Sequence, residues 1–231
     1  KTKGVISVFK KGLWIWHSPE CGKDEYAEFL DRFEYHGGGA ECLISCRDDY
    51  VLYINGTFVA CNQYSDFDRY KIYDRIDLSP YLHEGENIFA LLVWYCGGHS
   101  MRFCFSERGG AIFEIEGDGG TLLYSSEATP SRISRAYLSG RRKAITSQLG
   151  YSYLYDSTKE DGWINGEGDG FSTSHAASPD CFEFFERPIK KAVHLAPKCS
   201  KIIEKSHDGC HFTVDVGEET VGLFTVSLTS T

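Results

Sequence analysis

Long apolar segments are scarce in this sequence. The longest uninterrupted one covers residues 88–96, well short of the roughly 20 residues that a membrane-spanning helix needs. The first residues, Lys-Thr-Lys-Gly-Val-Ile, also lack the apolar stretch and small-residue cleavage site of a secretory signal peptide. We therefore expect no membrane partner and no signal peptide in this chain.

Positive charge is in short supply as well. The chain has 24 Lys and Arg against 33 Asp and Glu, which gives a net charge of −9. Proteins that bind DNA, RNA or anionic membranes do so through basic surface. The charge balance therefore argues against nucleic acid as a partner.

Motifs that pair cysteines are absent, although the sequence has nine cysteines. The number is odd and no Cys-x-x-Cys occurs, so neither a disulfide framework nor a zinc finger is expected. Cys42 and Cys46 share one face of a predicted strand over residues 40–46, where they would act as small buried hydrophobes. A reducing cytoplasm is the simplest setting for such cysteines.

Helical periodicity is also missing, whereas alternation of apolar and polar residues recurs. Clean alternation over residues 210–216 and 223–228 is typical of antiparallel strands with one wet face. Residues 88–95 are apolar on both faces and predict a central strand covered on both sides. Many short strands joined by Gly-rich turns predict an all-β antiparallel β-sandwich or jelly roll.

The clearest hairpin signal is Asn55-Gly56. Both central residues of a type I′ turn need positive φ, which Asn and Gly tolerate. Residues 50–54 and 57–61 are therefore predicted to pair as antiparallel strands. Their side chains are apolar on both faces, so the hairpin is expected inside the sandwich.

Aromatic residues are abundant, with 14 Tyr, 15 Phe and 4 Trp. They suit half-buried strands, and they also suit surfaces that stack on sugars. Tyr151, Tyr153 and Tyr155 would share one face of a predicted strand over residues 149–155. With Asp156 and Trp163 they form the candidate carbohydrate-binding site. The alternative, that half or more of the aromatic residues are core, stays open at this point.

Motifs for catalysis or metal binding are weak by comparison. Residues 165–170 resemble the first half of a calcium loop, but Ala176 stands where the bidentate Glu belongs, which favours a solvated acidic loop. The His residues of 207–211 flank an Asp-Gly turn signal, which favours a hairpin over a metal site. The adjacent acids 48–49 and 160–161 would point to opposite faces of a strand, unlike a glycosidase carboxylate pair. We predict no catalytic residue, no metal and no cofactor.

Five short sequence stretches are informative because they occur in a particular order along the chain. They read Tyr-Val-Leu-Tyr-Ile-Asn-Gly at 50–56, Tyr-Lys-Ile-Tyr-Asp at 70–74, Gly-Glu-Asn-Ile at 85–88, Gly-Tyr-Ser-Tyr-Leu-Tyr-Asp at 150–156 and Asp-Val-Gly at 215–217. This set resembles the N-terminal β-sandwich region of bacterial α-L-rhamnosidases, glycoside hydrolase family 78, and it covers most of the chain. One departure is that Ser152 and Thr158 stand where the family's loop commonly carries Glu and Arg.

The resemblance implies a bacterial, cytoplasmic parent enzyme that hydrolyses terminal α-L-rhamnose from glycosides, with its catalytic acids on a separate helical barrel. This chain would be a non-catalytic scaffold with carbohydrate contact. Residues 1–187 would form a jelly roll of galactose-binding-like type, and residues 188–231 the first strands of a second β-sandwich domain. Rhamnosides would be partners through the parent enzyme, and a homodimer is left open. The alternative is a stand-alone carbohydrate-binding module of another glycosidase.

Overall fold

The computed structural model describes residues 8–64, 70–98, 108–140, 143–146, 148, 150–177, 183–191, 195–196, 198, 200–209 and 211–219. The chain divides into two compact units, Lys1–Pro188 and Ile189–Thr231. The predicted strand over residues 223–228 lies outside the described residues. No helix in the described ranges is long and apolar enough to cross a membrane.

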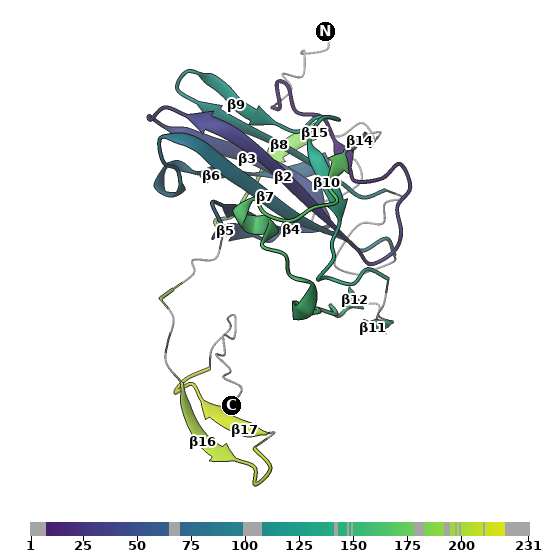
Figure 1. Ribbon diagram of the computed structural model, residues 1–231, viewed down its shortest axis with the longest axis vertical. Helices are drawn as coiled ribbons and strands as arrows, with labels where there is room; N and C mark the ends of the chain where they lie inside the picture. The colour runs from purple at the N-terminus through teal and green to yellow at the C-terminus, as the bar shows by residue number, and fades with distance from the viewer. Residues whose placement is uncertain are drawn as a thin grey trace. The chain divides into compact units, whose positions relative to one another are not determined.

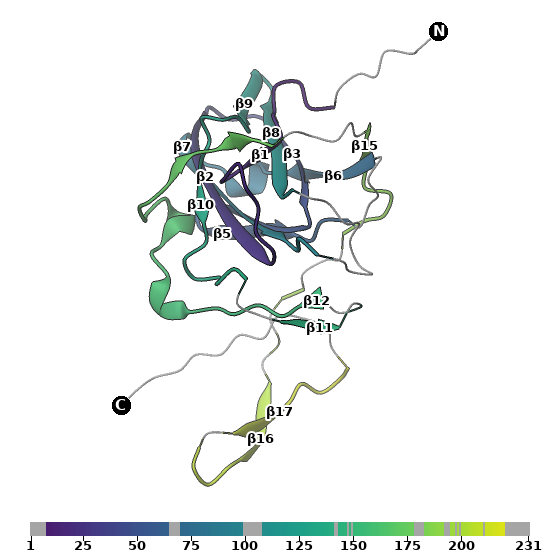
Figure 2. The same ribbon diagram turned by 90° about the vertical axis from the view of Figure 1, so that its right-hand side faces the viewer.

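The first unit contains two large sheets, which Figure 1 shows as one layer on the other and Figure 2 separates in side view. One is seven-stranded and the other six-stranded. The seven-stranded sheet has the order β14 (His175–Ala176), β1 (Ile15–Trp16), β8 (Gly110–Gly117), β3 (Ala40–Arg47), β6 (Tyr70–Asp77) and β15 (Glu183–Glu186), with β9 (Gly120–Tyr124) paired to β8. Its pairings are antiparallel except for β15, which runs parallel to β6.

The six-stranded sheet carries the longest ladder of the molecule. Its order is β13 (Ser172–Thr173), β10 (Pro130–Ile133), β2 (Glu25–Tyr35), β7 (Gly85–Tyr95), β4 (Asp49–Ile54) and β5 (Thr57–Cys61). β2 and β7 pair antiparallel over their whole length, from Glu25 opposite Tyr95 to Tyr35 opposite Gly85. The predicted central strand is thus confirmed as β7, which lies between β2 and β4.

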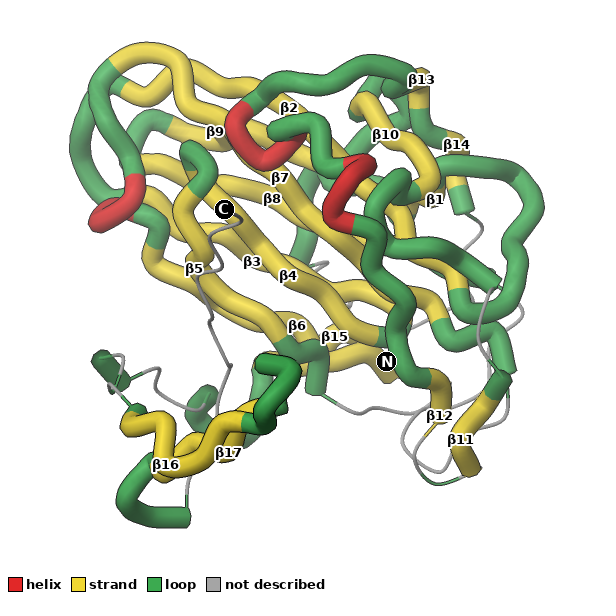
Figure 3. The backbone as a smooth tube through the Cα atoms, turned by 60° about the horizontal axis from the view of Figure 1, so that its bottom comes forward, coloured by secondary structure: helices red, strands yellow, loops and turns green. Residues whose placement is uncertain are grey.

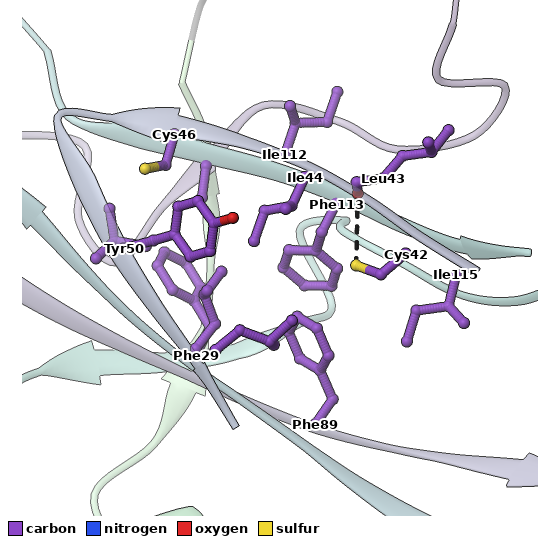
Figure 4. Close-up of a cluster of buried hydrophobic side chains, with 14 of the residues drawn as sticks. Phe29, Cys42, Leu43, Ile44, Cys46, Tyr50, Phe89, Ile112, Phe113 and Ile115 are labelled. Atoms are coloured by element: carbon purple, nitrogen blue, oxygen red, sulfur yellow. Dashed lines mark hydrogen bonds between the residues drawn. The ribbon is translucent and has the colours of Figure 1, made fainter. Parts of the chain in front are cut away.

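The main core fills the space between the two sheets. Phe89 of β7 and Phe113 of β8 face each other across it, with ring centroids 4.4 Å apart (Figure 4). Cys42 and Cys46 are fully buried in this core, as predicted for small hydrophobes. The prediction of an all-β antiparallel β-sandwich is confirmed, since alternating side chains of both sheets meet in one apolar layer.

The Asn55-Gly56 turn joins β4 to β5, as predicted. Asn55 has φ of 51° and Gly56 has φ of 72°, the positive values that a type I′ turn needs. Tyr50, Leu52 and Ile54 point into the main core, whereas Val51 and Tyr53 lie on the outer face of the sheet. The hairpin is therefore covered on both faces of β4, while β5 forms the edge of the sheet.

The remaining elements are short. Three 3₁₀ turns are described, η1 (Ser79–Tyr81), η2 (Ser157–Lys159) and η3 (Trp163–Asn165), and β11 (Ala144–Thr146) pairs with β12 (Gly150–Tyr151). The second unit shows one antiparallel pair, β16 (Lys201–Lys205) and β17 (Phe212–Asp215). That residues 188–231 open a second sandwich domain stays a prediction.

Candidate functional site

The outer face of the six-stranded sheet carries a second apolar cluster. Strands β2, β4 and β7 have apolar side chains on both faces, so those that point away from the main core need their own cover. The buried members are Tyr26, Ala90, Leu92 and Trp163, and the half-buried ones are Leu30, Val51, Tyr53, Trp94, Tyr137, Ile164 and Phe171. Most of the cluster's aromatic side chains are Tyr or Trp, which also carry a hydrogen-bonding group.

A segment that we call the strap, residues 156–171, covers this face. Figure 3 shows its short helical turns, drawn in red, of which η3 contacts β7. Trp163 is 5% exposed and packs edge-on against Tyr53, with ring centroids 6.4 Å apart. Gly162 and Gly166 flank η3 with φ of 73° and 81°, a left-handed conformation that glycine adopts without steric cost. These two glycines let the chain turn into and out of the Trp163 contact.

Arg132 of β10 fixes the strap to the sheet. Its Nε donates to Glu28 Oε2 at 2.7 Å, and its Nη1 and Nη2 donate to the two carboxylate oxygens of Asp161 at 2.7 and 2.9 Å. The guanidinium also lies 4.3 Å from the centre of the Phe171 ring. A bidentate, cation–π-supported arginine is a strong and geometrically specific anchor. The Arg132 hydrogen bonds hold the pKa of Asp161 below its usual value.

Next to the strap lies a group of tyrosines that we call the tyrosine face: the exposed Tyr153 and Tyr155 and the half-buried Tyr137. The Tyr137 ring stacks on Tyr26 of β2, at 5.1 Å between centroids and 21° between planes. Tyr155 and Tyr153 stand edge-on to Tyr137, at 4.9 and 6.1 Å. Backbone bonds fix this arrangement, since Leu138 N donates to Leu154 O and Asp156 N to Ala136 O, both at 2.9 Å.

One carboxylate contacts the tyrosine face, and a second lies buried beside Tyr26. The Tyr155 hydroxyl donates to Glu160 Oε1, and burial together with this bond raises the pKa of Tyr155. On the sheet side, Trp94 Nε1 donates to Asp24 Oδ1 at 3.0 Å. Burial, followed by the charge of Asp24, raises the pKa of Tyr26. The site thus combines neutral aromatic rings with negatively charged hydrogen-bond acceptors.

The five predicted site residues do not form one continuous stripe. The predicted strand over 149–155 is wrong in extent: β12 covers only Gly150–Tyr151, and Tyr155 makes an isolated bridge to Tyr137. The bridge needs tertiary contact with residues 136–138, so local alternation could not reveal where the strand ends. Tyr153 and Tyr155 share the tyrosine face and are 66% and 40% exposed.

None of the other three predicted residues adds an exposed ring to the tyrosine face. Tyr151 is half-buried, with its hydroxyl close to Gly98. Asp156 caps η2, accepting from Thr158 N at 3.2 Å and Thr158 Oγ1 at 2.6 Å, and these bonds lower its pKa. Trp163 of the strap is buried against the sheet and so offers no stacking surface. Their assignment to a carbohydrate site stays a prediction.

Three residues of the site are not predicted as site residues by the sequence: Tyr26, Tyr137 and Glu160. Tyr26 lies near the start of an alternating strand, and nothing in the sequence around it indicates that the Tyr137 ring stacks on it. Tyr137 lies in a stretch without clear periodicity, and Glu160 stands out in the sequence only as half of an adjacent acid pair. The Tyr155–Glu160 spacing across an Asp-x-Thr turn is the one signal that points to the contact.

The acidic loop at 165–170 is part of the strap and contacts arginine side chains of the sheet and of the chain after β10. Gly166 O accepts from Arg32 Nη2 at 2.8 Å, and the Asp169 carboxylate accepts from Arg135 Nη2. Within the described ranges, no group of three or more His, Cys, Asp or Glu could hold a metal ion.

Comparison with known proteins places the fold. No family model and no curated protein matches the sequence. Among solved structures, a GH78 family rhamnosidase of Bacillus sp. GL1 matches 78% of this chain, with a TM-score of 0.72 and 24% identity. The α-L-rhamnosidases of Dictyoglomus thermophilum and Aspergillus terreus match 78% and 90% of it, each with a TM-score of 0.60, at 16% and 17% identity.

The match spans only part of each enzyme. This chain covers 20%, 22% and 26% of the three rhamnosidase chains. At such identities the likeness concerns the fold, and it runs over most of this chain and a fraction of theirs. The chain thus has the β-sandwich fold of a segment of GH78 α-L-rhamnosidases.

Proposed function

We propose that this chain is the non-catalytic N-terminal β-sandwich part of an α-L-rhamnosidase, and that it contacts carbohydrate through the tyrosine face. The observation that carries the first half is the fold match to a segment of three rhamnosidases. The ordered sequence stretches at 50–56, 70–74, 85–88 and 150–156 support the same parent enzyme.

The tyrosine face carries the second half of the proposal. Tyr153 and Tyr155 offer exposed ring surface, and Glu160 supplies an acceptor beside them. Apolar sugar faces pack on aromatic rings, while sugar hydroxyls donate to fixed acceptors. Exposed aromatic residues beside Tyr137, whose ring stacks on Tyr26 of β2, suit this role.

An enzymatic test separates scaffold from catalyst. The 231-residue chain and the longer protein that carries it are incubated with an aryl α-L-rhamnoside. We expect release of the aryl group by the longer protein and none by the chain alone. Turnover by the chain alone would place catalytic carboxylates in the sandwich. Activity of the longer protein on another glycoside only would overturn the rhamnoside assignment.

A stand-alone carbohydrate-binding module is the second candidate, because the exposed tyrosines do not require a catalytic neighbour. It would be favoured if the longer protein hydrolysed no glycoside while the chain still bound sugar. The cytoplasmic location remains part of the proposal and rests on the sequence alone, and a homodimer stays open.

A further inference from the structure

Negative charge gathers around the tyrosine face. Residues 150–171 contain five acidic side chains and one basic side chain, Lys159. Lys159 pairs with Asp156 at 3.5 Å, and Asp161 is held by Arg132. Of the neighbouring basic run at 141–143, Lys143 is exposed and the two arginines lie outside the described residues.

Glu160 is the carboxylate that the structure fixes at this face. Tyr155 donates its hydroxyl to Glu160 Oε1, and the Tyr155 ring stands 4.9 Å from Tyr137. The negative charge therefore has a set position beside exposed ring surface. The charge of Glu160 also acts on neighbouring rings. Burial, and after it nearby groups that include Glu160, raise the pKa of Tyr137 and of Tyr53.

We propose that Glu160 makes the tyrosine face selective for neutral sugars over sugars that carry a carboxylate. This inference rests on the proposed function, because it names the ligand class of the same site. A carboxylate accepts hydrogen bonds from sugar hydroxyls but repels a second carboxylate. At an exposed site the repulsion amounts to a few-fold in affinity and extends about 10 Å at 0.1 M salt.

The test uses a pair of probes that differ in charge and by one methyl group. One is the disaccharide of α-L-rhamnose and galacturonic acid, and the other is its methyl ester. Both are titrated into the 231-residue chain at low salt while NMR shifts of the tyrosine rings are followed. We expect the neutral ester to bind about threefold tighter, and the difference to vanish at 0.5 M salt.

Two variants of acids in the strap identify the responsible group. Glu160→Gln keeps the shape of the side chain and should bring the two probes to equal affinity. Glu167→Gln removes an exposed acid of the same strap and should leave the preference intact. Equal binding of both probes to the unmodified chain, or a preference that survives Glu160→Gln, would overturn the inference. Absence of any shift with either probe and with methyl α-L-rhamnoside would instead remove the sugar site itself, and with it this inference and the carbohydrate-contact half of the proposed function.

Discussion

Single buried side chains decide much of the stability of this sandwich. Asp74 of β6 is 2% exposed and accepts from the Tyr50 hydroxyl in the main core. It also accepts from Arg187 Nη2 at 3.0 Å and from Arg187 Nε at 2.5 Å. Arg187 thereby secures the chain directly after β15. A buried carboxylate with two partners is costly to remove, because both partners lose their acceptor.

We predict that Asp74→Asn lowers the free energy of unfolding by about 3 kcal/mol, because it leaves the Arg187 charge buried without its counter-ion. Urea unfolding followed by tryptophan fluorescence reports this change, since all four Trp lie in the first unit. The same substitution at Asp77, an exposed residue of the same strand that accepts from Ser79 N, is the control and should cost under about 1 kcal/mol. Equal effects of the two variants would show that the Asp74 network adds nothing.

Among the elements, the strap depends on one cation. Arg132 side-chain atoms are 5% exposed, and they join Glu28 of β2 to Asp161 of the strap. Neighbouring Arg135 contacts Asp161 and Asp169 but is 42% exposed, so solvent screens its ion pairs. The two arginines thus have similar partners and different burial.

Arg132→Met should therefore lower the free energy of unfolding by about 3 kcal/mol, whereas Arg135→Met should cost at most about 1 kcal/mol. Hydrogen exchange shows which part of the chain is destabilised. The Arg132 variant is expected to lose amide protection in residues 156–171, while β3 and β8 keep theirs. If protection of the strap were unchanged in Arg132→Met, the strap would be held by Trp163 and its neighbours instead.

The same anchor predicts a pH dependence. The pKa of Asp161 is lowered in the folded chain by its Arg132 bonds, so its ionised form is favoured by folding. Stability from this group is present above the ordinary Asp pKa of about 4 and is lost as pH falls through the lower folded value. The stability gap between the unmodified chain and Asp161→Asn, measured by urea unfolding at several pH values, should narrow below about pH 4. A gap independent of pH from 7 to 2 would contradict the assignment.

Elements coded by local pattern were predictable from the sequence. The Asn55-Gly56 hairpin and strand β7 follow from turn chemistry and from apolar residues on both faces. Contacts between distant segments were not predictable: Arg132 meets Asp161, and Tyr137 meets Tyr155, only once β10 and the strap lie over the sheet. For the same reason the tyrosine stripe was predicted from alternation alone, and the structure keeps Tyr153 and Tyr155 on one face but not Tyr151.

For the whole molecule, the two units differ in what they bury. The first has a continuous core between its sheets. In the described part of the second, Ile202 and Ile203 of β16 are each 59% exposed, and Phe212 of β17 is 42% exposed. A two-stranded hairpin without a buried face is at best marginally stable in water.

Residues 1–188 should accordingly unfold cooperatively as a separate polypeptide, while residues 189–231 should show no cooperative transition. Thermal melts of the two polypeptides, followed by circular dichroism, provide the comparison. A sigmoidal melt of 189–231 would mean that this unit has a core of its own.

Sugar binding by the tyrosine face is the claim on which the functional account depends, and one titration tests it most directly. Methyl α-L-rhamnoside is added to the 231-residue chain, to Tyr153→Ala and to Tyr124→Ala, which removes a 42% exposed tyrosine of β9 in the other sheet. We predict saturable NMR shifts confined to Tyr137, Tyr153 and Tyr155, at least about fivefold weaker binding for Tyr153→Ala, and unchanged binding for Tyr124→Ala. Flat titrations at millimolar sugar, or equal losses in both variants, would contradict the account.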